Sequence, residues 1–153
     1  MKRNSLLILG LLLFHQSFSQ ITSSDRQRAE ALLKQMTVDE KIGQMTQVTM
    51  AVVATQGWGN QEGNLDPAAL KKAIEDYKVG SILNDVSNAL TAEKWRTNIT
   101  QIQDEAKKTR LRIPVIYGLD GIHGQTYTLN STLFPQNIAM AATRNPELVV
   151  QAA

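Results

Sequence analysis

The chain has 153 residues, of which 42% are hydrophobic and 20% charged, as in an ordinary globular protein. It contains no cysteine, which excludes disulfide bonds, thiolate metal sites and a cysteine nucleophile. The formal net charge of +2 comes from Lys2 and Arg3, because the other 14 basic residues balance 14 acidic ones, and this balance argues against a nucleic-acid-binding surface.

Residues 1–19 have the pattern of a signal peptide. Lys2 and Arg3 precede an apolar run, residues 6–14, that is too short to span a bilayer, and small residues follow where cleavage before Gln20 requires them. The alternative is an apolar N-terminal helix that stays in the protein. Since no cysteine follows the run, a lipoprotein anchor is excluded. The sequence predicts an exported protein, periplasmic or extracellular, that begins at residue 20 and has no membrane anchor.

The first helices are predicted by two capping boxes, formed by Ser24 with Gln27 and by Thr37 with Glu40. Apolar residues follow each box at helical spacing. They are Ala29, Leu32, Leu33 and Met36 after the first box, and Ile42 and Met45 after the second.

Strands and helices alternate after the second box. Residues 47–54, 79–83 and 113–117 favour strands, and helices begin at Asp66, with Pro67 in its first turn, and at Thr91. The predicted buried sides carry Leu70, Ile74 and Tyr77 in one helix and Trp95, Ile99, Ile102 and Ala106 in the other. The alternation predicts an α/β fold with a parallel sheet.

The end of the Thr91 helix carries Lys107, Lys108 and Arg110, which suit the negative end of a helix dipole. We expect a solvated helix end here rather than a nucleic-acid patch. Further along, Asn145 and Pro146 predict the start of a final helix.

The third predicted strand leads into a loop in which Gly118, Gly121 and Gly124 surround Asp120 and His123. Glycines at this spacing indicate tight turns or a close approach of another molecule to the backbone. An acid just after a parallel strand is where an α/β barrel has its chemistry, and Asp85 follows the second strand in the same way. The simpler alternatives are a loop aspartate bonded to nearby amides for Asp120 and a capping residue for Asp85.

Four segments in this order resemble the N-terminal barrel domain of family 3 glycoside hydrolases, the β-glucosidase group. They are MTVDEKIGQMTQV (36–48), YKVGSILN (77–84), IPVIYGLDGIHG (113–124) and STLFPQNIAMAATRNPELV (131–149). The resemblance covers almost everything after the leader. It implies that residues 20–153 are the front part of a (β/α)₈ TIM-like barrel, incomplete here because such a barrel needs about 250 residues.

The resemblance also implies a function. The full-length enzyme would be an exo-acting, retaining hydrolase that releases terminal β-D-glucose from β-linked oligosaccharides or glucosides, with no cofactor and no metal. Its nucleophile and acid/base lie in later motifs, so no catalytic residue is expected in this chain and the isolated chain is expected to be inactive. Asp120 matches the family aspartate that binds hydroxyls of the terminal sugar. The alternatives are a β-xylosidase or other exo-glycosidase of this family, and a non-catalytic carbohydrate-binding relative.

Other candidate residues have simpler interpretations. His123 is the only histidine after residue 19, which argues against a metal site, and the resemblance implies that it shapes its loop. Trp58 could stack on a sugar, although covering its own loop is the more common role. For two tyrosines, Tyr117 and Tyr127, packing is the default. The sequence also holds two possible glycosylation acceptors, Asn98 and Asn130, which matter only in a eukaryotic secretory pathway.

Overall fold

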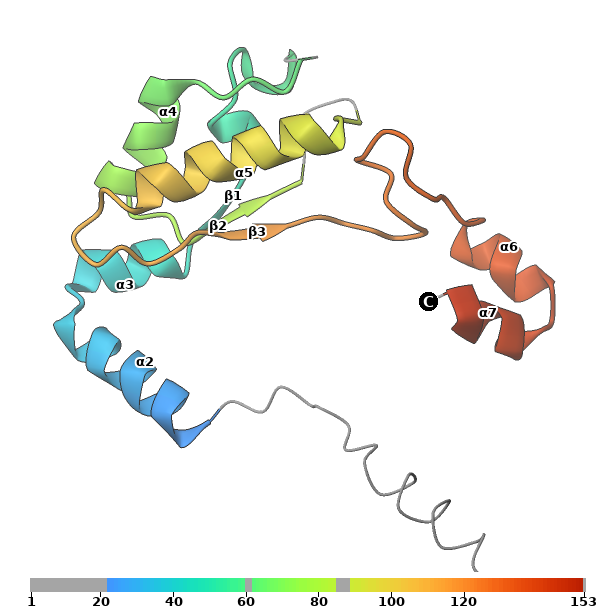
Figure 1. Ribbon diagram of the computed structural model, residues 1–153, viewed down its shortest axis with the longest axis horizontal. Helices are drawn as coiled ribbons and strands as arrows, with labels where there is room; N and C mark the ends of the chain where they lie inside the picture. The colour runs from blue at the N-terminus through green and yellow to red at the C-terminus, as the bar shows by residue number, and fades with distance from the viewer. Residues whose placement is uncertain (1–21, 60–61, 85–88, 153) are drawn as a thin grey trace, which may run out of the picture. The chain divides into compact units, whose positions relative to one another are not determined.

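The computed structural model describes residues 22–59, 62–84 and 89–152 (Figure 1). The predicted signal peptide and Asp85 lie outside these residues. The chain divides into two compact units between Gln35 and Met36. Within the described residues, no helix combines the length and the apolar character needed to cross a bilayer.

Helix α2 (Ser23–Gln35) belongs to the first unit. Its start is capped by Thr22 and Asp25: the Thr22 hydroxyl accepts from the Asp25 amide at 3.2 Å, and the Asp25 carboxylate accepts from the Thr22 amide at 3.2 Å. The predicted box of Ser24 with Gln27 is therefore wrong. The Asp25 carboxylate places a negative charge at the positive end of the helix, which a glutamine cannot do.

Helix α3 (Val38–Gln44) opens the second unit with the predicted capping box. The Thr37 hydroxyl accepts from the Glu40 amide at 3.2 Å, and the Glu40 carboxylate accepts from the Thr37 amide at 2.8 Å. The end of α3 packs on the backbone that leads into the strand beginning at Ser81, where the Gly80 amide donates to the Gly43 carbonyl at 2.9 Å. A Cβ on Gly43 would lie 2.5 Å from the Lys78 carbonyl oxygen, so only glycine permits this approach.

Three short parallel strands, in the order β1-β2-β3, form the sheet: β1 (Gln47–Thr49), β2 (Ser81–Leu83) and β3 (Ile116–Gly118). All three are shorter than predicted. The chain turns into a 3-10 helix, η1 (Met50–Val52), directly after β1. The register aligns Val48, Ile82 and Tyr117 across the sheet. The predicted parallel sheet is confirmed.

The segment between β1 and β2 includes the 3-10 turn η2 (Gly57–Gly59) and then α4 (Pro67–Lys71), which continues as a π-helical turn, η3 (Lys72–Asp76). Between β2 and β3 lies α5 (Ala92–Ala106). Figure 1 shows α4 and α5 on the same side of the sheet. The core lies between these helices and the sheet and includes Ile74, Ile82 and Ile102, all fully or almost fully buried.

Tyr77 does not lie in this core as predicted but is 63% exposed. The physical reason is the π-helical turn that precedes it. One extra residue per turn rotates the following side chain away from the face that Leu70 and Ile74 define.

The helix caps follow the sequence closely. The Asp66 carboxylate accepts from the amides of Ala68 and Ala69 at 2.8 and 3.1 Å, and the Thr91 hydroxyl accepts from the Lys94 amide at 3.1 Å. After β3 come α6 (Asn137–Ala142) and α7 (Pro146–Ala152), and α7 begins at the predicted Asn145 cap, whose side-chain oxygen accepts from the Leu148 amide at 3.0 Å. The predicted caps at Asp66, Thr91 and Asn145 are thus confirmed.

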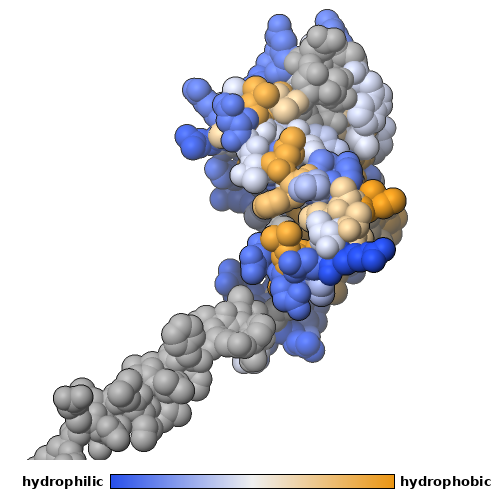
Figure 2. Space-filling model, turned by 90° about the vertical axis from the view of Figure 1, so that its right-hand side faces the viewer, coloured by the Kyte–Doolittle hydropathy of each residue, from blue (hydrophilic) through white to orange (hydrophobic). Residues whose placement is uncertain are grey.

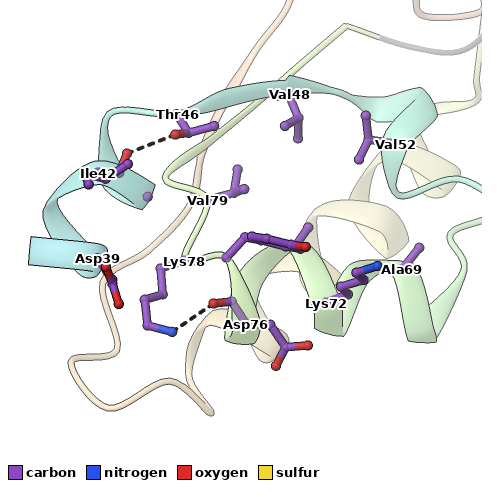
Figure 3. A pocket seen from close by; sticks show the side chains of 13 residues that line it. Asp39, Ile42, Thr46, Val48, Val52, Ala69, Lys72, Asp76, Lys78 and Val79 are labelled. Atoms are coloured by element: carbon purple, nitrogen blue, oxygen red, sulfur yellow. Dashed lines mark hydrogen bonds between the residues drawn. The ribbon is translucent and has the colours of Figure 1, made fainter.

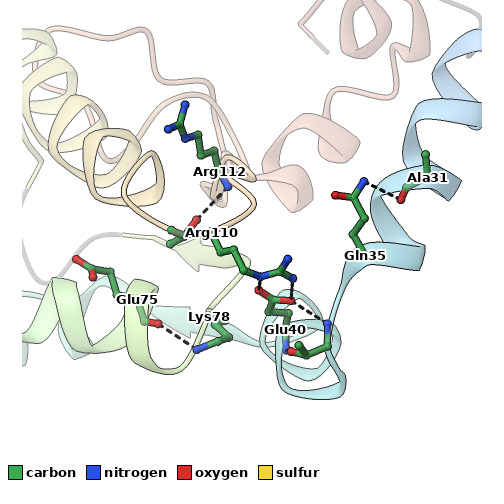
Figure 4. A network of polar contacts seen from close by, with 9 residues as sticks. Ala31, Gln35, Glu40, Glu75, Lys78, Arg110 and Arg112 are labelled. Carbon is green, nitrogen blue, oxygen red and sulfur yellow. Dashed lines mark hydrogen bonds and ion pairs between the residues drawn. The ribbon is translucent and has the colours of Figure 1, made fainter.

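The basic side chains after α5 are exposed, between 54% and 70%, which confirms the predicted solvated helix end, and each of them also pairs with an acid. Lys107 and Lys108 bind acids of α5, and Arg110 reaches back to Glu40 in α3 (Figure 4). The Arg110 guanidinium donates to the two Glu40 oxygens at 3.0 and 2.6 Å. This fork joins segments 70 residues apart in the sequence.

Candidate functional site

The candidate site lies where β2 and β3 end. The register pairs Leu83 with Gly118, so the residues that follow these two strands meet at the same edge of the sheet. Asn84 continues the pairing for one more step, because its amide donates to the Gly118 carbonyl at 2.8 Å. Asp120 lies two residues after Gly118, in the loop that follows β3.

The side chains of Asn84 and Asp120 form a reciprocal pair. The Asn84 Nδ2 donates to Asp120 Oδ2 at 2.8 Å, and the Asp120 amide donates to Asn84 Oδ1 at 3.0 Å. The Tyr117 hydroxyl adds a third contact by donating to the Asn84 carbonyl. Asn84 has a φ of 59°, in the left-handed region that asparagine tolerates better than most residues.

The Asp120 carboxylate is exposed and keeps one oxygen uncommitted. Among the described residues, its Oδ2 accepts from Asn84 and its Oδ1 accepts no hydrogen bond. The loop amides of Gly121 and Ile122 bond to backbone carbonyls instead. The simpler alternative, an aspartate that binds its own loop amides, is therefore not what the structure shows. A carboxylate so placed can accept hydrogen bonds from hydroxyl groups of a ligand.

The loop after Asp120 takes its shape from Gly124 and His123. Gly124 has a φ of 104°, and a Cβ there would collide with the Thr132 carbonyl oxygen. The His123 Nδ1 lies 2.7 Å from the Phe134 carbonyl oxygen and must donate to it, so Nε2, 2.9 Å from the Gln136 amide nitrogen, accepts. Both ring nitrogens of His123 bind within the loop, as a loop-shaping role requires.

The two tyrosines near the site have packing roles, as predicted, but Tyr117 has a polar one as well. Its ring meets Trp95 edge to face, with centroids 5.6 Å apart, and the Trp95 indole donates to the Tyr127 carbonyl at 2.8 Å. These contacts hold the Tyr117 ring in the position from which its hydroxyl donates to the Asn84 carbonyl. No sequence pattern predicts this hydroxyl contact or the Asn84–Asp120 pair.

The remaining sequence candidates fall elsewhere. Asn98 is fully buried and its amide donates to the Gly63 carbonyl at 2.8 Å, so the prediction of a glycosylation acceptor there is wrong, while Asn130 is exposed. Trp58 is 62% exposed in η2, and a sugar contact there stays a prediction. No group of three or more histidine, aspartate or glutamate side chains converges within residues 22–59, 62–84 and 89–152.

A separate groove of about 730 Å³ lies beside β1, between α3, β1 and the α4–η3 helix (Figure 3). Its lining is mostly apolar and includes Ile42, Val48 and Val79. The ammonium group of Lys78, at its rim, is bound by the Glu75 and Asp76 carbonyls at 3.1 and 2.9 Å. None of Asn84, Asp120 and His123 lines this groove, so it is not part of the candidate site.

Comparison with known proteins identifies the family of this chain. The sequence profile of the Glycosyl hydrolase family 3 N terminal domain matches residues 37–153. The chain is 34% identical to the Lysosomal beta glucosidase of Dictyostelium discoideum over 131 residues, which are 80% of this chain and 16% of that protein. It is also 34% identical to the Periplasmic beta-glucosidase of Salmonella typhimurium over 119 residues, 77% of this chain and 12% of that protein.

A third relative is the Probable beta-glucosidase C of Aspergillus flavus, 29% identical over 133 residues, 80% of this chain and 20% of that protein. The chain thus spans between 12% and 20% of the length of these three relatives. The family match includes all three strands and both members of the Asn84–Asp120 pair. The chain therefore belongs to glycosyl hydrolase family 3, and residues 37–153 correspond to the N-terminal domain of that family.

Proposed function

We propose that the chain is part of an exo-acting, retaining glycoside hydrolase that releases terminal β-D-glucose from β-glucosides. Membership of family 3 and the similarity to three β-glucosidases support this activity. Within this chain the contribution is substrate binding, and Asp120 is the residue that makes it. The observation that carries the proposal is the uncommitted carboxylate oxygen of Asp120 at the carboxyl ends of two parallel strands.

An ionised carboxylate suits the binding of a terminal sugar. Hydrogen bonds to a charged acceptor are roughly twice as strong as neutral ones. A site built on such bonds also discriminates against sugars that lack the bonded hydroxyl, because the carboxylate is then left without its partner. Asp120 can therefore contribute both affinity and specificity.

We further propose that the sheet is the front part of a (β/α)₈ barrel. The support is the parallel order and the open second face of the sheet: Gln47, Ser81 and Ile116 share this face, and Ile116 is 71% exposed. In such barrels the inward faces of the strands pack in layers around the axis.

Retention requires two carboxyl groups about 5–5.5 Å apart. We assign neither to this chain, so both belong to later parts of the enzyme.

The protein is also proposed to be exported, with residues 1–19 removed as a signal peptide. The charged start and the short apolar run of the sequence support this, and a relative named for the periplasm is compatible with it. The substrate is then a β-linked oligosaccharide or glucoside outside the cytoplasm, and the proposed reaction uses no cofactor.

One preparation tests the activity and the export together. The natural protein is purified from the culture, its N-terminus is determined by mass spectrometry, and it is assayed on aryl β-D-glucoside and β-D-xyloside. We expect a start near Gln20, preferred glucoside turnover and a β-configured first product. Preferred xyloside turnover would instead indicate a related exo-glycosidase, and binding without turnover a non-catalytic relative. An intact Met1 would contradict export.

A further inference from the structure

We propose that Asn84 is a positioning residue, which holds the Asp120 carboxylate in the orientation that receives the sugar. This inference rests on the proposed sugar-binding role of Asp120. It concerns a residue of the preceding strand end, 36 positions earlier in the sequence.

All four hydrogen-bonding groups of Asn84 bind to one short segment, residues 117–120. Its backbone amide donates to Gly118 and its carbonyl accepts from the Tyr117 hydroxyl. Its side chain accepts from the Asp120 amide and donates to the Asp120 carboxylate. The first two bonds fix the backbone of Asn84 against β3. The position of the Asn84 side-chain amide relative to Asp120 is therefore fixed as well.

The pairing fixes which oxygen of Asp120 is available. The χ2 torsion of an aspartate is broad, so an exposed carboxylate turns freely unless a partner holds it. The Asn84 side chain donates to Oδ2 at 2.8 Å and accepts from the Asp120 backbone amide at 3.0 Å, so Asp120 is held at its backbone and at one carboxylate oxygen. Oδ1 is then left for a ligand hydroxyl. A carboxylate ordered in advance loses less freedom when substrate binds.

The position selects asparagine on two grounds. A φ of 59° strains most side chains, but asparagine and glycine adopt it readily. The pair also needs an acceptor for the Asp120 amide and a donor for its carboxylate on one short side chain. Aspartate offers the acceptor but places a second negative charge against Asp120, and glycine offers neither group.

The test is a double-mutant cycle in the full protein as its gene encodes it, with aryl β-glucoside as substrate. Asn84→Gly removes the side chain without straining the backbone, and Asp120→Asn removes the charge. We expect each single variant to lower kcat/KM by about ten- to a hundred-fold. If Asn84 acts through Asp120, the double variant is no worse than Asp120→Asn alone.

Asn130→Gly is the matched control, because Asn130 is an exposed asparagine with a φ of 62° and lies outside the pair. We expect it to change kcat/KM by less than about two-fold, as surface substitutions usually do. Thermal unfolding is measured for every variant, so that a loss of fold is not read as a loss of positioning.

Asn84→Asp supplies a readout that a purely structural role would not move. At neutral pH the introduced carboxylate and that of Asp120 repel, and activity falls. As the pH decreases, one shared proton lets the introduced carboxyl group donate to Asp120 as the amide did, so activity relative to the unchanged protein recovers. Within the described residues, Tyr117 is the other titratable side chain bonded to the pair. Asp85 and His123, which are close to Asn84 and Asp120 in the sequence, are the same in both proteins.

The outcomes separate the two proposals. If Asp120→Asn leaves the kinetics unchanged, the proposed role of Asp120 fails. If Asp120→Asn is impaired but Asn84→Gly is normal, or the two losses add in the double variant, Asp120 keeps its role and the positioning role of Asn84 is overturned. Should Asn84→Gly fail to fold, the pH dependence of Asn84→Asp decides: recovery at acid pH supports positioning, and its absence overturns it.

Discussion

The side chain of Asp120 is exposed, and its carboxylate is nevertheless held by a hydrogen bond from Asn84. The Asn84 side chain binds Oδ2 and the backbone amide of Asp120, while Oδ1 accepts no hydrogen bond from the described residues. His123 makes no hydrogen bond to Asp120 in the described structure. Both of its ring nitrogens form hydrogen bonds that hold the loop after Asp120 in shape. In the proposed role, Asp120 is a single acceptor that is already oriented for a hydroxyl group of the substrate.

Asp120→Asn tests that acceptor in the full protein. The substitution keeps the shape and removes the charge, and the loss of a hydrogen bond to a charged group costs about 1.5–3 kcal/mol. We expect kcat/KM on a glucoside to fall by roughly ten- to a hundred-fold. The melting temperature should change little, because the side chain is exposed. Steady-state kinetics and thermal unfolding measure the two effects, and unchanged kinetics would leave Asp120 with no part in substrate binding.

Helix α3 is attached to the segment before β3 by the Glu40–Arg110 pair. Only 11% of the Glu40 side chain is exposed, and its carboxylate accepts from Arg110 at 3.0 and 2.6 Å and from the Thr37 amide at 2.8 Å. The hydrogen bonds from Arg110, and next the one from Thr37, lower the pKa of Glu40 from 4.5 to about 2. One carboxylate thus caps a helix and joins it to a distant segment.

This lowered pKa predicts a pH dependence of stability. Because the folded state holds Glu40 ionised below its ordinary pKa of 4.5, the stabilisation is complete above pH 4.5 and is lost as the pH falls towards 2. Glu40→Gln should therefore lower the melting temperature at pH 7 and flatten its decline below pH 4.5. Thermal unfolding followed by circular dichroism, from neutral pH down to the folded-state pKa of about 2, measures both effects.

Asp104→Asn is the control for Glu40→Gln. Asp104 pairs with Lys107 at 2.7 Å, but both side chains are more than half exposed, so this pair should contribute little. If Glu40→Gln and Asp104→Asn change the melting temperature alike across the pH range, the Glu40–Arg110 pair does not make the proposed contribution to stability.

Many large apolar side chains are exposed in the part of the chain that the structure describes. Figure 2 shows hydrophobic patches among the hydrophilic side chains of one face. The exposed hydrophobic side chains include Ile116 on the open side of the sheet and Ile138, Leu148 and Val150 in α6 and α7. The groove beside β1 is apolar as well. Surfaces of this kind are what the further strands and helices of a barrel would cover.

Residues 20–153 expressed alone should accordingly have no glycosidase activity. We propose that the nucleophile and the acid/base lie outside this chain, because the family resemblance places both in later motifs, and the proposed role of Asp120 is to bind the sugar only. The open apolar surface should also favour aggregation and binding of a hydrophobic dye. An aryl β-glucoside assay beside the full protein measures the first effect, and dye fluorescence the second. Turnover by the purified segment, abolished by a change at Asp120, would show that the catalytic carboxylates are misplaced.

The sequence by itself determined the local features of this protein. The caps at Thr37, Asp66, Thr91 and Asn145 depend on hydrogen bonds that span two or three residues, so the residue types predicted these four, although not the cap of α2. The alternation of strands and helices, and the place of Asp120 after a strand, are likewise readable from the order of residues. The four family motifs reached the same family as the later comparisons.

Only the tertiary structure decided the contacts between distant segments. Asn84 meets Asp120 across 36 residues because β2 and β3 pair in one particular register, and Arg110 meets Glu40 across 70 residues because of the path of the chain after α5. The exposure of Tyr77 depends on a single π-helical turn, and the burial of Asn98 on the loop that packs over it. Register, chain path and helical phase are set by the packing of the whole fold, and no short stretch of sequence encodes them.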